Sequence, residues 1–196
     1  SMQVYRHMDI GTAKPTPQEM DGVRHWMLDV VEPQESYSVA RYVEDATSCV
    51  EDILSRGKLP IVVGGTGLYI DALIRGTAFS RRGDPEVRQQ LAAEYDSLGG
   101  EAMLRRLGKV DAAAAQRLHP NDKKRIVRAL EIFTTTGKTI TEHDEETQKA
   151  PPRYRARKIA LSFREREDLY ARINLRVEEM FRRGLVDEVR RLLDMG

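Results

Sequence analysis

Apolar residues between positions 38 and 56 recur at the spacing of one helical face. This pattern predicts an amphipathic helix over residues 38–56, with Ser38 as its N-cap and Gly57 in the left-handed conformation that ends many helices. An unbroken apolar run, residues 59–63, follows and is typical of a strand covered on both faces. Residues 67–74 then return to a helical pattern. The order of helix, buried strand, glycine loop and helix predicts an α/β domain.

Two further strands and two further helices are predicted outside this stretch. The strand candidates are residues 26–31 and residues 158–163. Helices are expected over residues 165–183 and 186–195. The first of these helices should direct one row of apolar side chains inward, namely Leu169, Ile173, Val177, Met180 and Phe181. The α/β pattern therefore occupies both ends of the chain.

The middle of the chain contains no strand candidate. Asp84 is placed to cap a helix whose first position is Pro85. The rest of this region reads as short helices separated by glycines, including Gly108, and by a His-Pro-Asn turn. We therefore expect an all-helical insertion over residues 82–153, between α/β core segments at residues 1–81 and 154–196.

The composition excludes several classes of protein. Of the 196 residues, 40% are hydrophobic and 32% are charged, which suits a folded chain rather than a disordered one. No run approaches the roughly 18 consecutive apolar residues of a membrane span, and the N-terminal residues lack the apolar segment of a signal peptide. The single cysteine, Cys49, cannot form an internal disulfide, so we expect a reducing, cytoplasmic setting without membrane attachment.

The net charge of +1 hides an uneven distribution along the chain. The first core segment carries a net charge of −3, the insertion +1 and the last segment +3. Between Arg117 and Arg128 there are five cations and one anion. The near-zero total therefore does not exclude a nucleic-acid partner.

A glycine-rich loop, residues 64–67, lies between a predicted strand and a predicted helix. Gly64 and Gly65 let the backbone approach a ligand, and free N–H groups at a helix start favour an anion such as phosphate. Thr66 adds a hydroxyl at the same place. The loop is not a P-loop, because no Gly-Lys-Ser/Thr follows, and a tight turn without a ligand explains it equally well.

Several cations fall within one arc of the helix predicted after residue 122, namely Lys124, Arg125 and Arg128. The apolar residues Ile126, Leu130 and Phe133 lie on the opposite side and should pack inward. A basic face of this kind can grip nucleic-acid phosphates, although a solvated surface is the alternative.

Arg172 and Arg176 share one face of a later helix at the i, i+4 spacing. Two such arginines can clamp a diphosphate, or they can pair with neighbouring carboxylates such as Asp168. The four histidines are scattered, so no residue of this chain is expected to bind a metal.

Taken together, these stretches closely resemble the tRNA dimethylallyltransferase (tRNA isopentenyltransferase) family. The likeness covers essentially the whole chain in the family's order, and such a collinear set is far more specific than any single motif. The matching stretches are residues 1–5, 8–15, 63–69, 84–88, 119–131, 137–138, 172–173 with 176, 184–185 and 188–189.

The resemblance implies a P-loop NTPase-like parallel-sheet core, incomplete in this chain, with an all-helical insertion that embraces the tRNA anticodon stem-loop. It implies transfer of a dimethylallyl group from dimethylallyl diphosphate to N6 of an adenine beside the anticodon, with Mg2+ as cofactor. Such a base must leave its stack, and an unpaired loop makes that step inexpensive. We expect the enzyme to be a monomer.

The family's functional residues can be carried over by position. Thr66 matches a threonine that contacts the reacting groups, and Arg176 matches an arginine at the diphosphate, with Arg172 as a helper and Gly64 and Gly65 beside them. The loop that touches the target nucleotide aligns with Ser1, Met2 and Gln3. The tRNA contacts align with Arg88, Lys124, Arg125, Ile126, Val127 and Arg128.

The resemblance places the diphosphate-binding P-loop, the general-base aspartate and most Mg2+ ligands before residue 1, and a further tRNA-binding segment after residue 196. We therefore expect the chain to be an incomplete, inactive fragment of a longer enzyme. The alternatives are an adenylate dimethylallyltransferase acting on free AMP, a noncatalytic RNA-binding derivative of the fold, and a small-molecule P-loop kinase. The basic helical insertion disfavours the adenylate dimethylallyltransferase and the small-molecule kinase.

Overall fold

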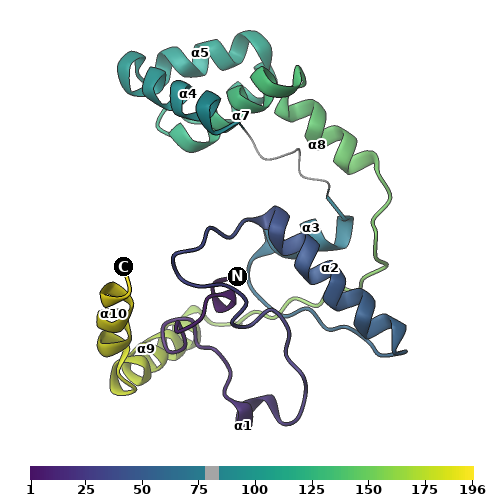
Figure 1. Ribbon diagram of the computed structural model, residues 1–196, viewed down its shortest axis with the longest axis vertical. Coiled ribbons are helices and arrows are strands. Elements are labelled where there is room, and N and C mark those ends of the chain that lie inside the picture. The colour runs from purple at the N-terminus through teal and green to yellow at the C-terminus, as the bar shows by residue number, and fades with distance from the viewer. Residues whose placement is uncertain (78–83) are drawn as a thin grey trace. The chain divides into compact units, whose positions relative to one another are not determined.

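The computed structural model describes residues 1–77 and 84–196, which divide into two compact units. The core unit comprises residues 1–76 and 153–196, and the helical unit comprises residues 77–152 (Figure 1). The boundary predicted at residues 81–82 lies outside the described residues. In the described part of the chain, no helix is both long enough and apolar enough to cross a lipid bilayer.

The core unit is organised around α2 (Val39–Ser55) and α3 (Gly67–Arg75), which pack against each other. Ser38 caps α2 as predicted, because its hydroxyl accepts a hydrogen bond from the Arg41 N–H at 3.3 Å. Gly57 follows the helix with a φ of 64°, the conformation expected of it. The rings of Tyr42 and Tyr69 stack with centroids 4.5 Å apart, which fixes the two helices side by side. Both predicted helices are therefore confirmed.

The three predicted strands do not form within the described residues. Met27 and Asp29 have φ values of 63° and 54°, which turn the backbone where a strand was expected. Among the residues that the structure describes, strand pairing is limited to an isolated parallel bridge between Tyr5 and Val31. The other two candidates, residues 59–63 and 158–163, leave apolar side chains in solvent, including Val63 at 88% and Leu161 at 95% exposure. A strand exists only when a neighbour pairs with it, so the predicted parallel-sheet core is absent from this part of the chain.

The end of the core unit is a helical pair, α9 (Arg166–Arg182) and α10 (Leu185–Asp194), joined at Gly184 (Figure 1). Both helices were predicted. The expected inward row on α9 is not buried, because Leu169, Ile173, Val177 and Phe181 are exposed and Met180 is half-buried. Helical periodicity defines such a face but does not supply a surface that covers it. Two short elements, η1 (Met2–Val4) and α1 (Pro17–Met20), complete the unit.

The helical unit contains five helices among the described residues. These are α4 (Pro85–Leu98), α5 (Gly100–Val110), α6 (Ala112–Arg117), α7 (Lys123–Thr136) and α8 (Ile140–Lys149) (Figure 1). Leu91, Met103, Leu107, Ile126 and Leu130 form the centre of a shared core between α4, α5 and α7. The unit is therefore held by its own apolar interior.

Local chemistry sets the helix boundaries of this unit. Asp84 caps α4 as predicted, with Oδ1 accepting from the Glu86 N–H at 2.9 Å. The expected break at Gly108 is wrong: α5 continues through it and ends at Val110. A Cβ atom at Gly100 would lie 2.1 Å from the Pro120 carbonyl oxygen, so only glycine lets α5 begin so close to that turn.

Asp111 is the buried carboxylate that joins α6 to α8. Its Oδ1 accepts from the Ala114 N–H at 2.9 Å and from the Thr141 hydroxyl at 2.7 Å, and its Oδ2 accepts from the Thr141 N–H at 3.1 Å. Burial by itself would raise the pKa of Asp111, but these hydrogen bonds outweigh it and lower the pKa.

Candidate active site

Thr66 and Ser1 meet at the start of α3. Thr66 occupies the N-cap position, yet its hydroxyl makes no capping bond and donates instead to the Ser1 hydroxyl oxygen at 3.0 Å. The two residues are 65 positions apart, so the contact depends on tertiary structure. The contact brings Thr66, expected at the reacting groups, next to Ser1, expected in the loop that touches the target nucleotide.

The glycine loop before Thr66 is open to solvent. Gly64 has a φ of 157°, and a Cβ atom added at Gly64 or Gly65 would meet no atom within 4 Å. The free N–H groups at the start of α3 and the exposed glycine backbone leave space for an anionic group next to Thr66. No described side chain or backbone atom crowds Gly64 or Gly65.

Gln3 lies in the N-terminal loop and is held by backbone carbonyls. Its Nε2 donates to the Thr12 oxygen at 3.0 Å and to the Ala13 oxygen at 2.8 Å. Both donors of the side-chain amide are therefore engaged within the protein, and Oε1 remains as its acceptor. Met2 and Ser1 precede it on the same 3-10 turn and are exposed.

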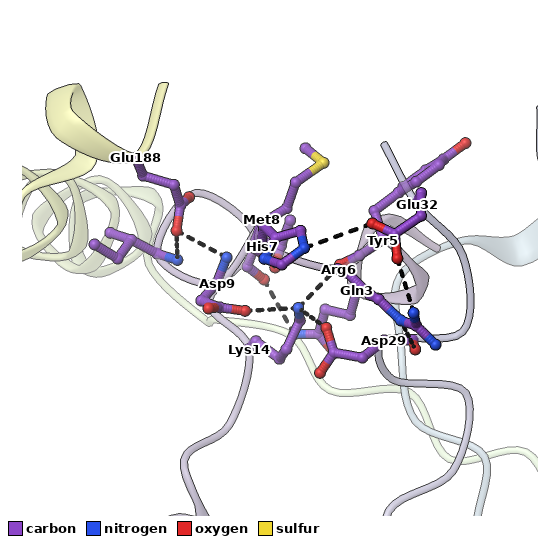
Figure 2. A network of polar contacts seen from close by, with 12 residues as sticks. Gln3, Tyr5, Arg6, His7, Met8, Asp9, Lys14, Asp29, Glu32 and Glu188 are labelled. Atoms are coloured by element: carbon purple, nitrogen blue, oxygen red, sulfur yellow. Dashed lines mark hydrogen bonds and ion pairs between the residues drawn. The ribbon is translucent and has the colours of Figure 1, made fainter. Parts of the chain in front are cut away.

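Lys14 is the buried centre of this loop (Figure 2). Its Nζ donates to the Tyr5 carbonyl oxygen at 2.9 Å, to Asp9 Oδ1 at 2.7 Å and to Asp29 Oδ1 at 2.5 Å. Burial by itself would lower the pKa of Lys14, but the hydrogen bonds and charges of Asp29 and Asp9 outweigh it and raise the pKa. The ammonium group therefore stays charged and satisfies all three of its donors.

Glu188 is the polar residue of this site that sequence reasoning missed. It comes from α10, its exposure is 3%, and its carboxylate accepts from three successive backbone N–H groups. Figure 2 shows this carboxylate beside Asp9. Oε2 lies 2.8 Å from the Asp9 nitrogen and 2.7 Å from the Ile10 nitrogen, and Oε1 lies 2.9 Å from the Gly11 nitrogen. The sequence offered no signal for this contact beyond the occurrence of Glu188 in a matching stretch.

Arg172 and Arg176 lie on α9, and both side chains are exposed. Within the described ranges neither arginine forms an ion pair, so the pairing with Asp168 considered for them is not present. No hydrogen bond connects either arginine to Thr66 among the described residues. The structure thus joins Thr66 to Ser1 but does not bring the two arginines into that contact.

The predicted basic face lies on α7 of the helical unit. Lys124 and Arg125 are exposed, and Arg125 makes one long ion pair, 3.4 Å, with Asp122. Arg128 on α7 and Arg88 on α4 both bind Oε2 of Glu131, at 2.9 and 3.0 Å. One carboxylate therefore holds the two guanidinium groups next to each other.

Glu131 itself is 0% exposed, and its Oε1 has no hydrogen-bond partner among the described residues. Ile126 and Val127 are also buried, so their side chains belong to the core of the helical unit and not to its surface. Ile126 and Leu130 confirm the inward face predicted for α7, while Phe133 is half-buried.

No three His, Cys, Asp or Glu side chains come together as a metal site within residues 1–77 and 84–196.

Comparison with known proteins assigns the chain to a family. A family model described as IPP transferase matches residues 3–196. The tRNA dimethylallyltransferase of Acetivibrio thermocellus is 47% identical over 197 residues, and that of Geobacter sulfurreducens is 50% identical over 196 residues. Each alignment covers 100% of this chain and 63% of the relative, so the chain spans less than two thirds of their length.

Solved structures give the same result. The full-length tRNA isopentenylpyrophosphate transferase of Bacillus halodurans is 44% identical with a TM-score of 0.63, and all of this chain aligns with 60% of that one. A eukaryotic dimethylallyltransferase acting on tRNA is 31% identical with a TM-score of 0.75, and all of this chain aligns with 48% of it. The chain belongs to the IPP transferase family.

Proposed function

We propose that this protein transfers a dimethylallyl group from dimethylallyl diphosphate to N6 of an adenine next to a tRNA anticodon. The observation that carries the proposal is the 3.0 Å contact between Thr66 and Ser1. It unites the glycine loop, where a diphosphate would bind, with the loop that resembles the family's nucleotide-binding segment. Membership of the IPP transferase family supports the same reaction.

In the proposed reaction, the adenine N6 forms a bond to C1 of the dimethylallyl group while the bond from C1 to the diphosphate oxygen breaks. The amine gives up one proton to a carboxylate general base of the whole enzyme, and the diphosphate leaves with the bonding electron pair. Thr66 would donate a hydrogen bond to the reacting groups, and Gly64 and Gly65 would present backbone N–H groups to the diphosphate. Arg176, assisted by Arg172, would approach the leaving group when substrate binds.

The basic face of α7, here called the α7 surface, would bind the anticodon stem-loop through Lys124, Arg125 and Arg128, together with Arg88 of α4. Ile126 and Val127 would act by fixing the helix, because their side chains are buried. Ser1, Met2 and Gln3 would contact the target nucleotide. We further infer a P-loop-type core, cytoplasmic location and monomeric action. Mg2+ would support departure of the diphosphate, but the proposal assigns no Mg2+ ligand to the described residues.

The decisive experiment uses the whole gene product with labelled dimethylallyl diphosphate and a synthetic anticodon stem-loop. We expect label on N6 of the adenine next to the anticodon, and no transfer to free AMP. Transfer to AMP alone would identify an adenylate dimethylallyltransferase. Tight binding of the stem-loop without any transfer would identify a noncatalytic RNA-binding protein.

A further inference from the structure

The carboxylate of Glu188 is an unusual feature of the core unit. It is almost fully buried, and its partners are the three consecutive N–H groups of Asp9, Ile10 and Gly11. No Lys, Arg or His forms an ion pair with it within the described ranges. A buried carboxylate is costly unless it is well satisfied, and here the backbone of a distant loop satisfies it.

The loop that Glu188 binds is tightly connected within itself. The Thr12 hydroxyl donates to the Met8 oxygen at 2.5 Å, the Ala13 N–H to the Ile10 oxygen at 3.0 Å, and the Lys14 N–H to the Asp9 oxygen at 2.9 Å. Residues 8–14 therefore form a compact unit, here called the staple loop.

The far end of the staple loop holds Gln3. The carbonyl oxygens of Thr12 and Ala13 accept both amide donors of Gln3. Lys14 donates to the Tyr5 carbonyl oxygen (Figure 2). A continuous chain of hydrogen bonds thus leads from α10 through the staple loop to residues 3–5. Ser1, which contacts Thr66, lies two residues before Gln3.

We propose that Glu188 is a positioning residue that fixes the acceptor-binding segment, residues 1–3, through the staple loop. The inference rests on the proposed function, in which that segment contacts the target nucleotide. Glu188 touches no reacting atom. It acts by keeping the staple loop, and with it Gln3, in the geometry that receives the base.

The test substitutes Glu188→Gln in the whole gene product. The amide keeps one acceptor oxygen but turns an N–H donor toward one of the three backbone donors, so the loop loses part of its anchor. We expect kcat/KM for the anticodon stem-loop to fall about 10-fold, mainly through KM. The KM for dimethylallyl diphosphate should stay within about twofold of wild type.

The matched control is Asp187→Asn, which removes the same charge from the adjacent position of α10, where Asp187 is exposed and pairs with Arg190. It should leave both KM values unchanged. A double-mutant cycle with Gln3→Ala gives the second readout. If Glu188 acts through Gln3, the double variant loses no more than the worse single variant, whereas a purely structural role gives additive losses.

Gly11→Ala changes the loop side of the contact, because the Gly11 N–H donates to Glu188. The added Cβ would lie 3.4 Å from Glu188 Oε1 and 3.3 Å from Leu185 Cδ1, so it crowds α10 at this contact, and Leu185 must shift slightly while the carboxylate is kept. Gly11→Ala should raise the KM for the stem-loop by a smaller factor than Glu188→Gln does. This variant provides the answer if Glu188→Gln does not fold.

Amide hydrogen exchange tests the contact between Glu188 and the staple loop independently of prenyl transfer. Glu188→Gln should speed amide exchange at residues 9–14 whether or not the wild-type protein transfers a prenyl group. Absence of transfer by the wild type overturns the proposed function alone. Unchanged exchange in the staple loop, additive losses with Gln3→Ala, or equal rises in both KM values overturn the role of Glu188.

Discussion

Arg88 donates from Nε to Oε2 of Glu131 across 3.0 Å, so a half-exposed guanidinium on α4 is fixed by a fully buried carboxylate on α7. Arg128 shares the same oxygen at 2.9 Å. Either arginine alone can neutralise the carboxylate. The loss of both leaves a buried charge without a partner, and that loss is the costly event.

Single and double substitutions at this carboxylate should therefore be strongly non-additive. Arg88→Ala and Arg128→Ala should each lower the free energy of unfolding by about 1 kcal/mol. The double variant should lose about 3 kcal/mol or more. Urea unfolding measures all three. Adding Glu131→Leu to the double variant should recover most of the loss, and strictly additive losses without recovery would contradict the shared-carboxylate account.

The α7 surface should contribute to RNA affinity through charge. Replacing Lys124, Arg125 and Arg128 together by Ala should weaken stem-loop binding and reduce the slope of log affinity against log salt by about 2 to 3. Filter binding at several salt concentrations measures the slope. The control replaces Arg105, Lys109 and Lys149, which are exposed on α5 and α8 and carry the same total charge. An equal effect of both triples would mean that only net charge matters.

Thr66 should affect turnover more than stability. Thr66→Val keeps the shape of the side chain but removes the hydroxyl that donates to Ser1. We expect kcat for transfer to fall about 100- to 1,000-fold, the range for loss of a hydrogen-bond donor at a reacting centre. Thr66→Ser retains the hydroxyl and should remain within a few-fold of wild type. Equal activity of the Val and Ser variants would remove Thr66 from the site.

Asp111 should make the helical unit sensitive to acid. Its pKa is lower in the folded state than the ordinary 3.8, so its contribution to stability is complete above about pH 3.8 and is lost as the pH falls through the folded value. Asp111→Asn should cost about 1 kcal/mol at neutral pH and progressively less below pH 3.8. Urea unfolding at neutral and acidic pH measures the difference. Asp144 is exposed on α8, so the difference in unfolding free energy between Asp144→Asn and wild type should not shrink below pH 3.8.

The helices could be predicted from the sequence because their signals are local. Ser38 and Asp84 cap the helices that immediately follow them, and each lies within three residues of the N–H group that it binds. The strands could not be predicted in the same way. Residues 59–63 have the composition of a buried strand, but a strand also needs a partner, and pairing is a property of the whole fold.

The candidate site could likewise be predicted only in part from the sequence. Thr66 and Ser1 were identified through resemblance, and the structure brings them together. The role of Glu188 was not predictable, because its partners lie 177 to 179 residues away and no spacing rule connects them. The role of Glu131 was not predictable for another reason. A carboxylate next to a basic helix face is expected at the surface, whereas the side chain of Glu131 is buried.

The bare apolar run at residues 59–63 has a practical consequence for handling this chain. Leu59, Ile61 and Val63 are largely exposed, β-branched residues dominate the run, and no charge interrupts it. Pro60 interrupts this run, so a cross-β ladder is not expected, but exposed apolar residues gathered in one segment favour contacts between molecules. Concentrated preparations in which this segment stays uncovered will therefore self-associate through it, and a single charged substitution at Ile61 should be enough to keep the molecules apart.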